Sequence, residues 1–186
     1  MESMKAITNL VKENMKNSTK AEEKEWVAKP PDDWEEKIGI PKRFQDVKPA
    51  EWKNNLIIGP AGSGKSYLAA QMVKSLKGPR INAIWVNVPK LLFDFRRDFD
   101  REIVERVLRK DYVVLDDLGA EHTTDWVAGV IYIIVNSVWE NQKNLAVTSN
   151  LKPSEIGKRF GDRLASRILD ICKVQEMKDK DRRLEK

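Results

Sequence analysis

The sequence feature that most constrains this chain is a glycine-rich segment between a predicted strand and a predicted helix. Residues 59–66 read Gly-Pro-Ala-Gly-Ser-Gly-Lys-Ser and match the pattern Gly-x-x-x-x-Gly-Lys-Ser/Thr in full. The apolar run at 55–58 is typical of a buried strand, and the apolar spacing over 65–76 predicts a helix. Glycines let backbone amides turn toward an anion, and the helix that begins there adds its positive dipole end. The segment therefore predicts a loop that binds the phosphates of a nucleotide.

All eight residues of this loop are candidate ligands of the nucleotide: Gly59, Pro60, Ala61, Gly62, Ser63, Gly64, Lys65 and Ser66. We expect the Lys65 ammonium to reach the β- and γ-phosphates and the Ser66 hydroxyl to ligate Mg²⁺. The alternative is a glycine-rich turn that matches the pattern by chance. The strand before the loop and the helix after it argue against that alternative.

A second candidate site lies where the apolar run 112–115 ends in two adjacent carboxylates. In a parallel sheet, such a strand end lies beside the phosphate loop. We expect Asp116 to hold Mg²⁺, directly or through water, and Asp117 to orient or deprotonate the attacking water. An Asp-Asp pair after a strand can also simply cap a turn. Together with the phosphate loop, the pair favours a nucleotide hydrolase.

The rest of the chain alternates short apolar runs with helical patterns. Strands are predicted over 55–58, 83–86, 112–115, 145–147 and 171–175, with amphipathic helices between them. Buried strands that alternate with helices form a parallel sheet covered on both faces. The sequence therefore predicts a three-layer α/β fold of the phosphate-loop NTPase type, with a central parallel sheet of about five strands.

Composition excludes several classes of protein. Of 186 residues, one is cysteine and one is histidine, which rules out an internal disulfide and a Cys/His zinc site. We expect Cys172 to be a small buried hydrophobe. The longest apolar run has nine residues, 127–135, whereas a membrane span needs about 20. We therefore expect a cytoplasmic protein with no membrane contact, and a net charge of +5 permits a nucleic-acid partner.

The amino-terminal part differs from the remainder. Residues 1–50 carry ten basic and ten acidic side chains and few apolar ones. We expect 1–38 to form an arm, partly helical around 7–15, that either docks a partner or is a solvated tail. The core domain is then expected over 39–186.

Several segments resemble the DnaC/IstB-like AAA+ ATPases. Residues 116–121, Asp-Asp-Leu-Gly-Ala-Glu, look like the Walker B segment of that family, and 39–44, Gly-Ile-Pro-Lys-Arg-Phe, are similar to the segment before its ATPase core. Residues 147–151 resemble its sensor strand, 163–168 its arginine-finger helix, and 181–183 the charged end of its domain. Val138 departs from the pattern, because relatives usually carry an arginine before the aromatic residue there.

The resemblance implies roles for five further residues. Asn150 would be the polar sensor of the γ-phosphate or the attacking water, and Arg167 the finger that reaches a neighbouring subunit's γ-phosphate, with Arg163 as a weaker candidate. Ile40 and Phe44 would lie near the adenine. The alternatives are a turn cap for Asn150, a salt bridge with Asp162 or Asp170 for Arg167, and ordinary packing for Ile40 and Phe44.

The resemblance also implies the function. Such a chain would bind and hydrolyse Mg-ATP at the interfaces of a homo-oligomer and load a replicative helicase in DNA replication. Region 89–110 has seven basic and five acidic residues with three interleaved phenylalanines, which suits single-stranded DNA as well as an ordinary solvated face. The alternatives are a transposition helper of the IstB type, a small-molecule kinase, and a DNA-binding module with a structural nucleotide.

Overall fold

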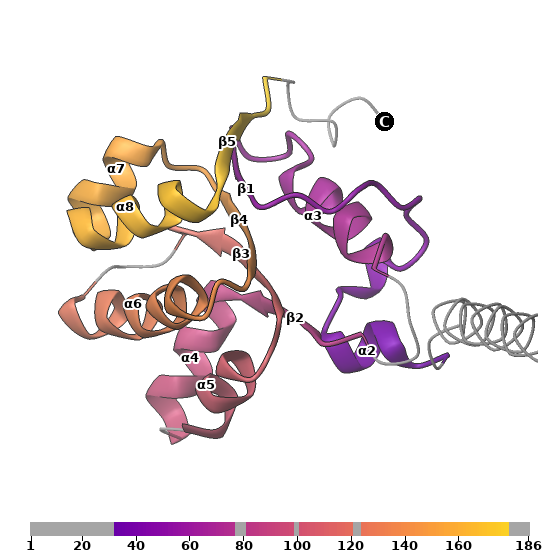
Figure 1. The fold of residues 1–186 in the computed structure, drawn as a ribbon, viewed down its shortest axis with the longest axis horizontal. Coiled ribbons are helices and arrows are strands. Elements are labelled where there is room, and N and C mark those ends of the chain that lie inside the picture. The colour runs from indigo at the N-terminus through magenta and orange to yellow at the C-terminus, as the bar shows by residue number, and fades with distance from the viewer. Residues whose placement is uncertain (1–31, 77–80, 99–100, 121–123, 179–186) are drawn as a thin grey trace, which may run out of the picture.

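A computed structural model describes residues 32–76, 81–98, 101–120 and 124–178. Five parallel strands form one sheet in the order β2-β3-β4-β1-β5 (Figure 1). The strands are β1 (Asn55–Ile58), β2 (Ala83–Asn87), β3 (Tyr112–Leu118), β4 (Asn144–Ser149) and β5 (Lys173–Glu176). This arrangement confirms the predicted α/β fold with a five-stranded parallel sheet. Within the described ranges, no helix combines the length and the apolar character that a membrane crossing requires.

Helices cover both faces of the sheet (Figure 1). One face carries α4 (Val88–Asp98), α5 (Arg101–Leu108), α6 (Asp125–Glu140), α7 (Pro153–Phe160) and α8 (Asp162–Ile171). The other carries α2 (Trp34–Ile38), the short 3₁₀ helix η1 (Lys42–Phe44) and α3 (Lys65–Lys74).

Alternation along the strands divides the core between these two faces. In β1, Leu56 and Ile58 belong to the cluster under α4–α8, whereas Ile57 belongs to the cluster under α2 and α3. Successive side chains of a strand point to opposite faces, so a strand buried on both sides is apolar at most positions. Cys172 lies in the first cluster, as predicted, and burial raises the pKa of its thiol to about 12.

The short helix α2 lies inside the predicted arm and packs on the core. Ile38 is buried, and Trp34 packs against the second cluster. Lys74 of α3 pairs with Glu35 and places its ammonium 5.6 Å from the Trp34 ring centroid. The last residues before the predicted boundary at 38/39 therefore contact the folded unit. The helix predicted around 7–15 lies outside the described residues.

Four of the five strands differ from the predictions in their bounds. Strand β2 continues to Asn87, and β4 covers Asn144–Ser149 rather than 145–147. Strand β3 does not end at 115 but continues through both carboxylates to Leu118, with a shift of register against β4 between Leu115 and Leu118. A bulge of this kind inserts an extra residue and re-aims the side chains beside it. Strand β5 begins at Lys173 rather than at 171, because Ile171 still packs as the last residue of α8.

Candidate nucleotide site

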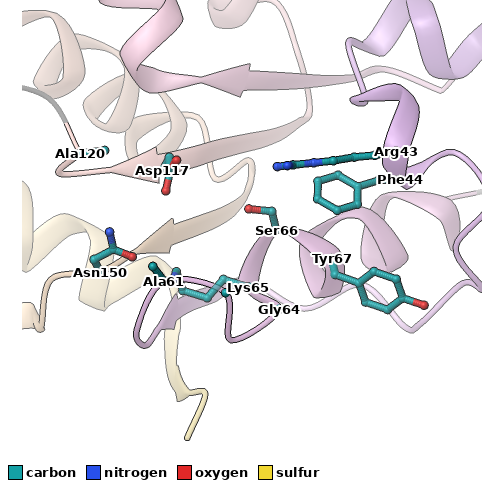
Figure 2. Close-up of a pocket in the computed structure, with 11 residues that line it drawn as sticks. Arg43, Phe44, Ala61, Gly64, Lys65, Ser66, Tyr67, Asp117, Ala120 and Asn150 are labelled. Carbon is teal, nitrogen blue, oxygen red and sulfur yellow. The ribbon is translucent and has the colours of Figure 1, made fainter. Parts of the chain in front are cut away.

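A pocket of about 570 Å³ opens at the carboxyl ends of β1, β3 and β4 (Figure 2). Its volume lies in the range typical of small-molecule sites. The carboxyl edge of a parallel sheet is also where such sites form, since loops from several strands meet there. The pocket is lined by Arg43, Phe44, Ala61, Gly62, Gly64, Lys65, Ser66, Tyr67, Asp117, Ala120 and Asn150.

The predicted phosphate loop forms one wall of this pocket. It lies between the end of β1 and the first residue of α3, Lys65. The Lys65 Nζ donates hydrogen bonds of 2.8 Å to the carbonyl oxygens of Gly59 and Pro60. Ser63 is fully buried, and its Oγ has no hydrogen-bond partner in the described chain. A buried ammonium and an unpaired buried hydroxyl in one anion-binding loop fit a phosphate ligand.

The first glycine of the loop has no room for a side chain. Gly59 has a φ of +153°, and a Cβ there would lie 2.5 Å from the carbonyl oxygen of Met177. Met177 is held in place because its amide donates a 2.7 Å hydrogen bond to the Ile58 carbonyl at the end of β1. Both the backbone angle and the close approach therefore require glycine.

Asp116 is the buried carboxylate of the site, 3% exposed. Its Oδ1 accepts hydrogen bonds of 2.7 Å from the hydroxyls of Ser66 and Thr148. Ser66 and Asp116, the predicted metal ligands, thus lie within hydrogen-bond distance of each other. Hard oxygen ligands next to a phosphate loop are the donor set that suits Mg²⁺.

Burial raises the pKa of Asp116, and the nearby Asp117 carboxylate raises it further. The hydroxyls of Thr148 and Ser66 and the Arg43 guanidinium act in the opposite direction. The net effect is a raised pKa for Asp116. The ionised carboxylate therefore costs free energy in this buried position, and a bound cation would reduce that cost.

The bulge in β3 presents Asp117 to the pocket. Asp117 adopts the left-handed conformation, with a φ of +67°, which a non-glycine residue rarely does. Its amide donates a 2.9 Å hydrogen bond to Thr148 Oγ1, which fixes the bulge to β4. Asp117 and Asn150, which follows β4, face the same space from neighbouring strand ends (Figure 2). The structure therefore brings both predicted residues to the phosphate loop.

Of the two residues predicted to contact the adenine, one lines the pocket and the other is buried in the core. Phe44 lines the pocket, but Ile40 is only 3% exposed and lies in the core cluster beneath α3. Three pocket residues were missed by sequence reasoning, namely Arg43, Tyr67 and Ala120. The Arg43 guanidinium lies 4.6 Å from the Phe44 ring centroid and points toward the space that Ser66 and Asp117 face (Figure 2). Its position beside Phe44 in the sequence was the available signal.

Thr148 was predicted only as part of a resembling strand, yet it is hydrogen-bonded both to the Asp116 carboxylate and to the Asp117 backbone amide. It is fully buried in β4, donates to Asp116 and accepts from Asp117. A polar residue at a buried strand position must find hydrogen-bond partners. That requirement is the signal that would have assigned Thr148 to the site.

Arg167 does not line the pocket of its own chain. It lies on α8 with its guanidinium carbon 4.7 Å from the Tyr132 ring centroid and 5.1 Å from that of Trp139. The described part of the chain gives Arg167 no ion pair with Asp162 or Asp170, the alternative considered above. Asp170 instead accepts a 2.6 Å hydrogen bond from Trp139 Nε1.

A family model matches residues 40–186, and its description is IstB-like ATP binding protein. The chain belongs to this ATP-binding family. The resemblance that the motifs indicated is thereby confirmed, and it covers the phosphate loop, both carboxylates, Asn150 and Arg167. A search of curated proteins finds no match to the chain.

Solved structures share the fold. The DnaC helicase loader is 22% identical, with a TM-score of 0.58 over 81% of this chain and 93% of that one. DnaI is 21% identical, with a TM-score of 0.58 over 73% of this chain and 80% of that one. AMPPCP-bound DnaA from Aquifex aeolicus is 16% identical, with a TM-score of 0.54 over 74% of this chain and 43% of that one. At these identities the likeness concerns the AAA+ fold.

Replacement of Asp116 by asparagine should stabilise the metal-free protein at neutral pH. A carboxyl whose folded-state pKa is raised favours the folded state below its ordinary pKa and loses that contribution as the pH rises through the raised value. Asparagine keeps an oxygen for Ser66 and Thr148 without the charge. We expect a melting temperature higher by on the order of 2–4 °C at pH 7 with a chelator present.

The difference in melting temperature between the variant and the wild type should shrink toward zero as the pH falls below the ordinary pKa range of a carboxyl. Equal melting temperatures at pH 7 would show that the buried charge carries no cost.

Proposed function

We propose that the chain is an AAA+ ATPase that hydrolyses Mg-ATP at the boundary between two copies and acts as a helicase loader in DNA replication. The observation that carries the proposal is the convergence of Lys65, Ser66, Asp116, Asp117 and Asn150 around one pocket at the sheet edge. Membership of an ATP-binding family supports ATP as the nucleotide.

Each group then has a chemical task. When ATP binds, the Lys65 ammonium exchanges its hydrogen bonds to the loop carbonyls for contacts with the β- and γ-phosphates, whose charge it neutralises. The loop amides donate hydrogen bonds to other phosphate oxygens. Ser66 and Asp116 would hold Mg²⁺, which would neutralise part of the negative charge of the triphosphate. Asp117 accepts a proton from the attacking water as the water oxygen bonds to the γ-phosphorus. Asn150 orients that water, and the bond to the β–γ bridging oxygen breaks to leave ADP and phosphate.

Arg167 is proposed to act in the pocket of a neighbouring copy. It lies on α8, away from its own phosphate loop, which is compatible with a contribution in trans. An arginine that meets charge developing on the transferred phosphoryl group raises turnover by about 10³–10⁵. Turnover is accordingly expected to be slow in dilute protein and faster in assemblies.

The proposed partners are a replicative helicase and single-stranded DNA. The similar solved structures support the helicase, and residues of α4 and α5 support the DNA. The DnaC likeness supports a replicative helicase as the partner. Phe93 on α4 is 60% exposed in a region that also carries Lys90, Arg106 and Lys110, a combination that suits a strand of DNA with exposed bases. The side chains of Phe95 and Phe99 lie outside the described residues.

A second candidate is a helper ATPase that brings a transposase to target DNA, and the IstB-like family match favours it. Both candidates use the same ATPase core. Affinity purification from the native host distinguishes them, since recovery of a replicative helicase supports the loader and recovery of a transposase supports the helper.

The proposed reaction is tested by incubating the full chain with Mg-ATP alone and measuring phosphate. Phosphate release without any acceptor, increasing with protein concentration and with single-stranded DNA, is expected. Turnover that strictly requires a small-molecule acceptor would instead identify a kinase. Tight ATP retention with no turnover under any assembly condition would identify a structural nucleotide.

A further inference from the structure

The outer side of α6 is unusual for a helix on the protein surface. Residues 126–139 carry no charged side chain, and the exposed apolar residues include Trp126 and Ile133, which are 36% and 52% exposed. A helix that covers one face of a sheet normally turns charged residues to water. An apolar outer side indicates that another surface covers it.

The same helix holds Arg167 against two aromatic rings. Tyr132 and Trp139 are two turns apart on one side of α6, and the Arg167 guanidinium stacks on both, at 4.7 and 5.1 Å. The Trp139 ring is itself fixed, because its Nε1 donates a 2.6 Å hydrogen bond to Asp170 on α8. We call Tyr132, Trp139 and Asp170 the arginine cradle.

One buried polar atom on α6 and one on α8 lack a hydrogen-bond partner among the residues that the structure describes. The Nη1 atom of Arg167 is buried and has no hydrogen-bond partner among the described residues. Asn136, which occupies the turn of α6 between Tyr132 and Trp139, has a buried Oδ1 that is also unpaired. Buried polar groups are nearly always satisfied, so these two atoms, one on α6 and one on α8, are unused hydrogen-bonding groups beside the cradle.

We propose that the arginine cradle is a positioning device, which fixes Arg167 for the nucleotide of a second copy that docks on the outer side of α6. This inference rests on the proposed function. The partner is a second copy because the residues that the structure describes give Arg167 no anionic acceptor, whereas the pocket described above would present a triphosphate. The rings hold the cation by their faces, which leaves its in-plane N–H groups available for phosphate oxygens.

A double-mutant cycle on turnover tests the cradle. Tyr132→Leu keeps apolar bulk but removes the ring face, and Tyr132→Phe keeps the face. We expect Tyr132→Leu to lower kcat of the assembled protein roughly tenfold, the equivalent of one cation–π contact, with KM for ATP unchanged. Tyr132→Phe should retain wild-type kcat. In an Arg167→Ala background, Tyr132→Leu should cause no further loss, because the group that it positions is gone.

The possible results separate the inference from the function on which it rests. An equal loss from Tyr132→Leu with and without Arg167 would overturn the cradle, since the tyrosine would then act only through general structure. An increase in kcat would also overturn it, because the rings would be storing Arg167 away from the nucleotide. If Arg167→Ala itself leaves turnover unchanged, the finger role in the proposed function fails as well.

Trp139→Phe provides a second variant in case the leucine variant does not fold. It keeps an aromatic face but loses the hydrogen bond to Asp170. We expect a smaller fall in kcat that is again absent in the Arg167→Ala background. A fall that persists in that background would contradict the inference.

Discussion

Replacing Lys65 with alanine should weaken ATP binding by at least roughly 100-fold, the equivalent of losing one or two charge-assisted hydrogen bonds to phosphate. Lys65 is 6% exposed, and its ammonium lies against two loop carbonyls at the mouth of the phosphate loop. Nothing else among the residues that line the pocket places a cation inside that loop. Calorimetric titration of the folded variant with a non-hydrolysable ATP analogue and Mg²⁺ measures the change.

The matched control is Lys53→Ala. Lys53 is also near β1, but its side chain is 64% exposed and its ion pair among the described residues is with the exposed Glu51. We expect this variant to bind the analogue with wild-type affinity. Unchanged affinity in Lys65→Ala, with its melting temperature preserved, would remove the phosphate loop from the site and the ATPase proposal with it.

The second large effect is expected from Arg167→Ala, which should keep ATP affinity and lose at least about 10³-fold in the turnover of assemblies. Asp117→Asn should show the same separation of binding from turnover, because Asp117 lines the pocket and is proposed to accept the proton of water. Each variant is expected to be nearly inactive alone. Steady-state phosphate release and analogue binding, measured on the same preparations, give the two readouts.

Mixing the two variants tests whether Arg167 acts in trans. In a random one-to-one mixture, about one quarter of the boundaries join an intact Asp117 pocket to an intact Arg167, so partial recovery of turnover is expected. Arg163→Ala is the control on the same helix, since Arg163 is exposed and is the weaker candidate. Mixed assemblies that form but recover no turnover would contradict the trans assignment.

Local rules were sufficient for the phosphate loop and for the order of elements. Glycine spacing, the strand before the loop and the helix after it are all encoded within about twenty neighbouring residues, and the structure places them as expected. The apolar runs predicted β1 to β4, because a parallel sheet buried on both faces needs apolar residues at most positions. Strand β5 is a largely exposed edge strand with one apolar residue, Val174, so this rule does not account for it.

The details of the site depend on contacts between distant segments. The bulge that presents Asp117 is fixed by the hydrogen bond from the Asp117 amide to Thr148 Oγ1 of β4. No pattern within β3 encodes that pairing. Ile40 and Phe44 are four residues apart in the chain, yet the turn of η1 sends one into the core and the other into the pocket. The contact of Arg167 with Tyr132 and Trp139 likewise requires α6 and α8 to be packed together.

The contact between Met177 and the phosphate loop has a mechanical consequence. Strand β5 lies at the edge of the sheet and pairs with β1, so tension applied to the chain beyond Lys178 would be transmitted through that pairing to Gly59. A bulky reporter or a surface tether attached beyond Lys178 would therefore apply force to the phosphate loop. Single-molecule and immobilisation experiments should therefore anchor this protein through its amino-terminal side.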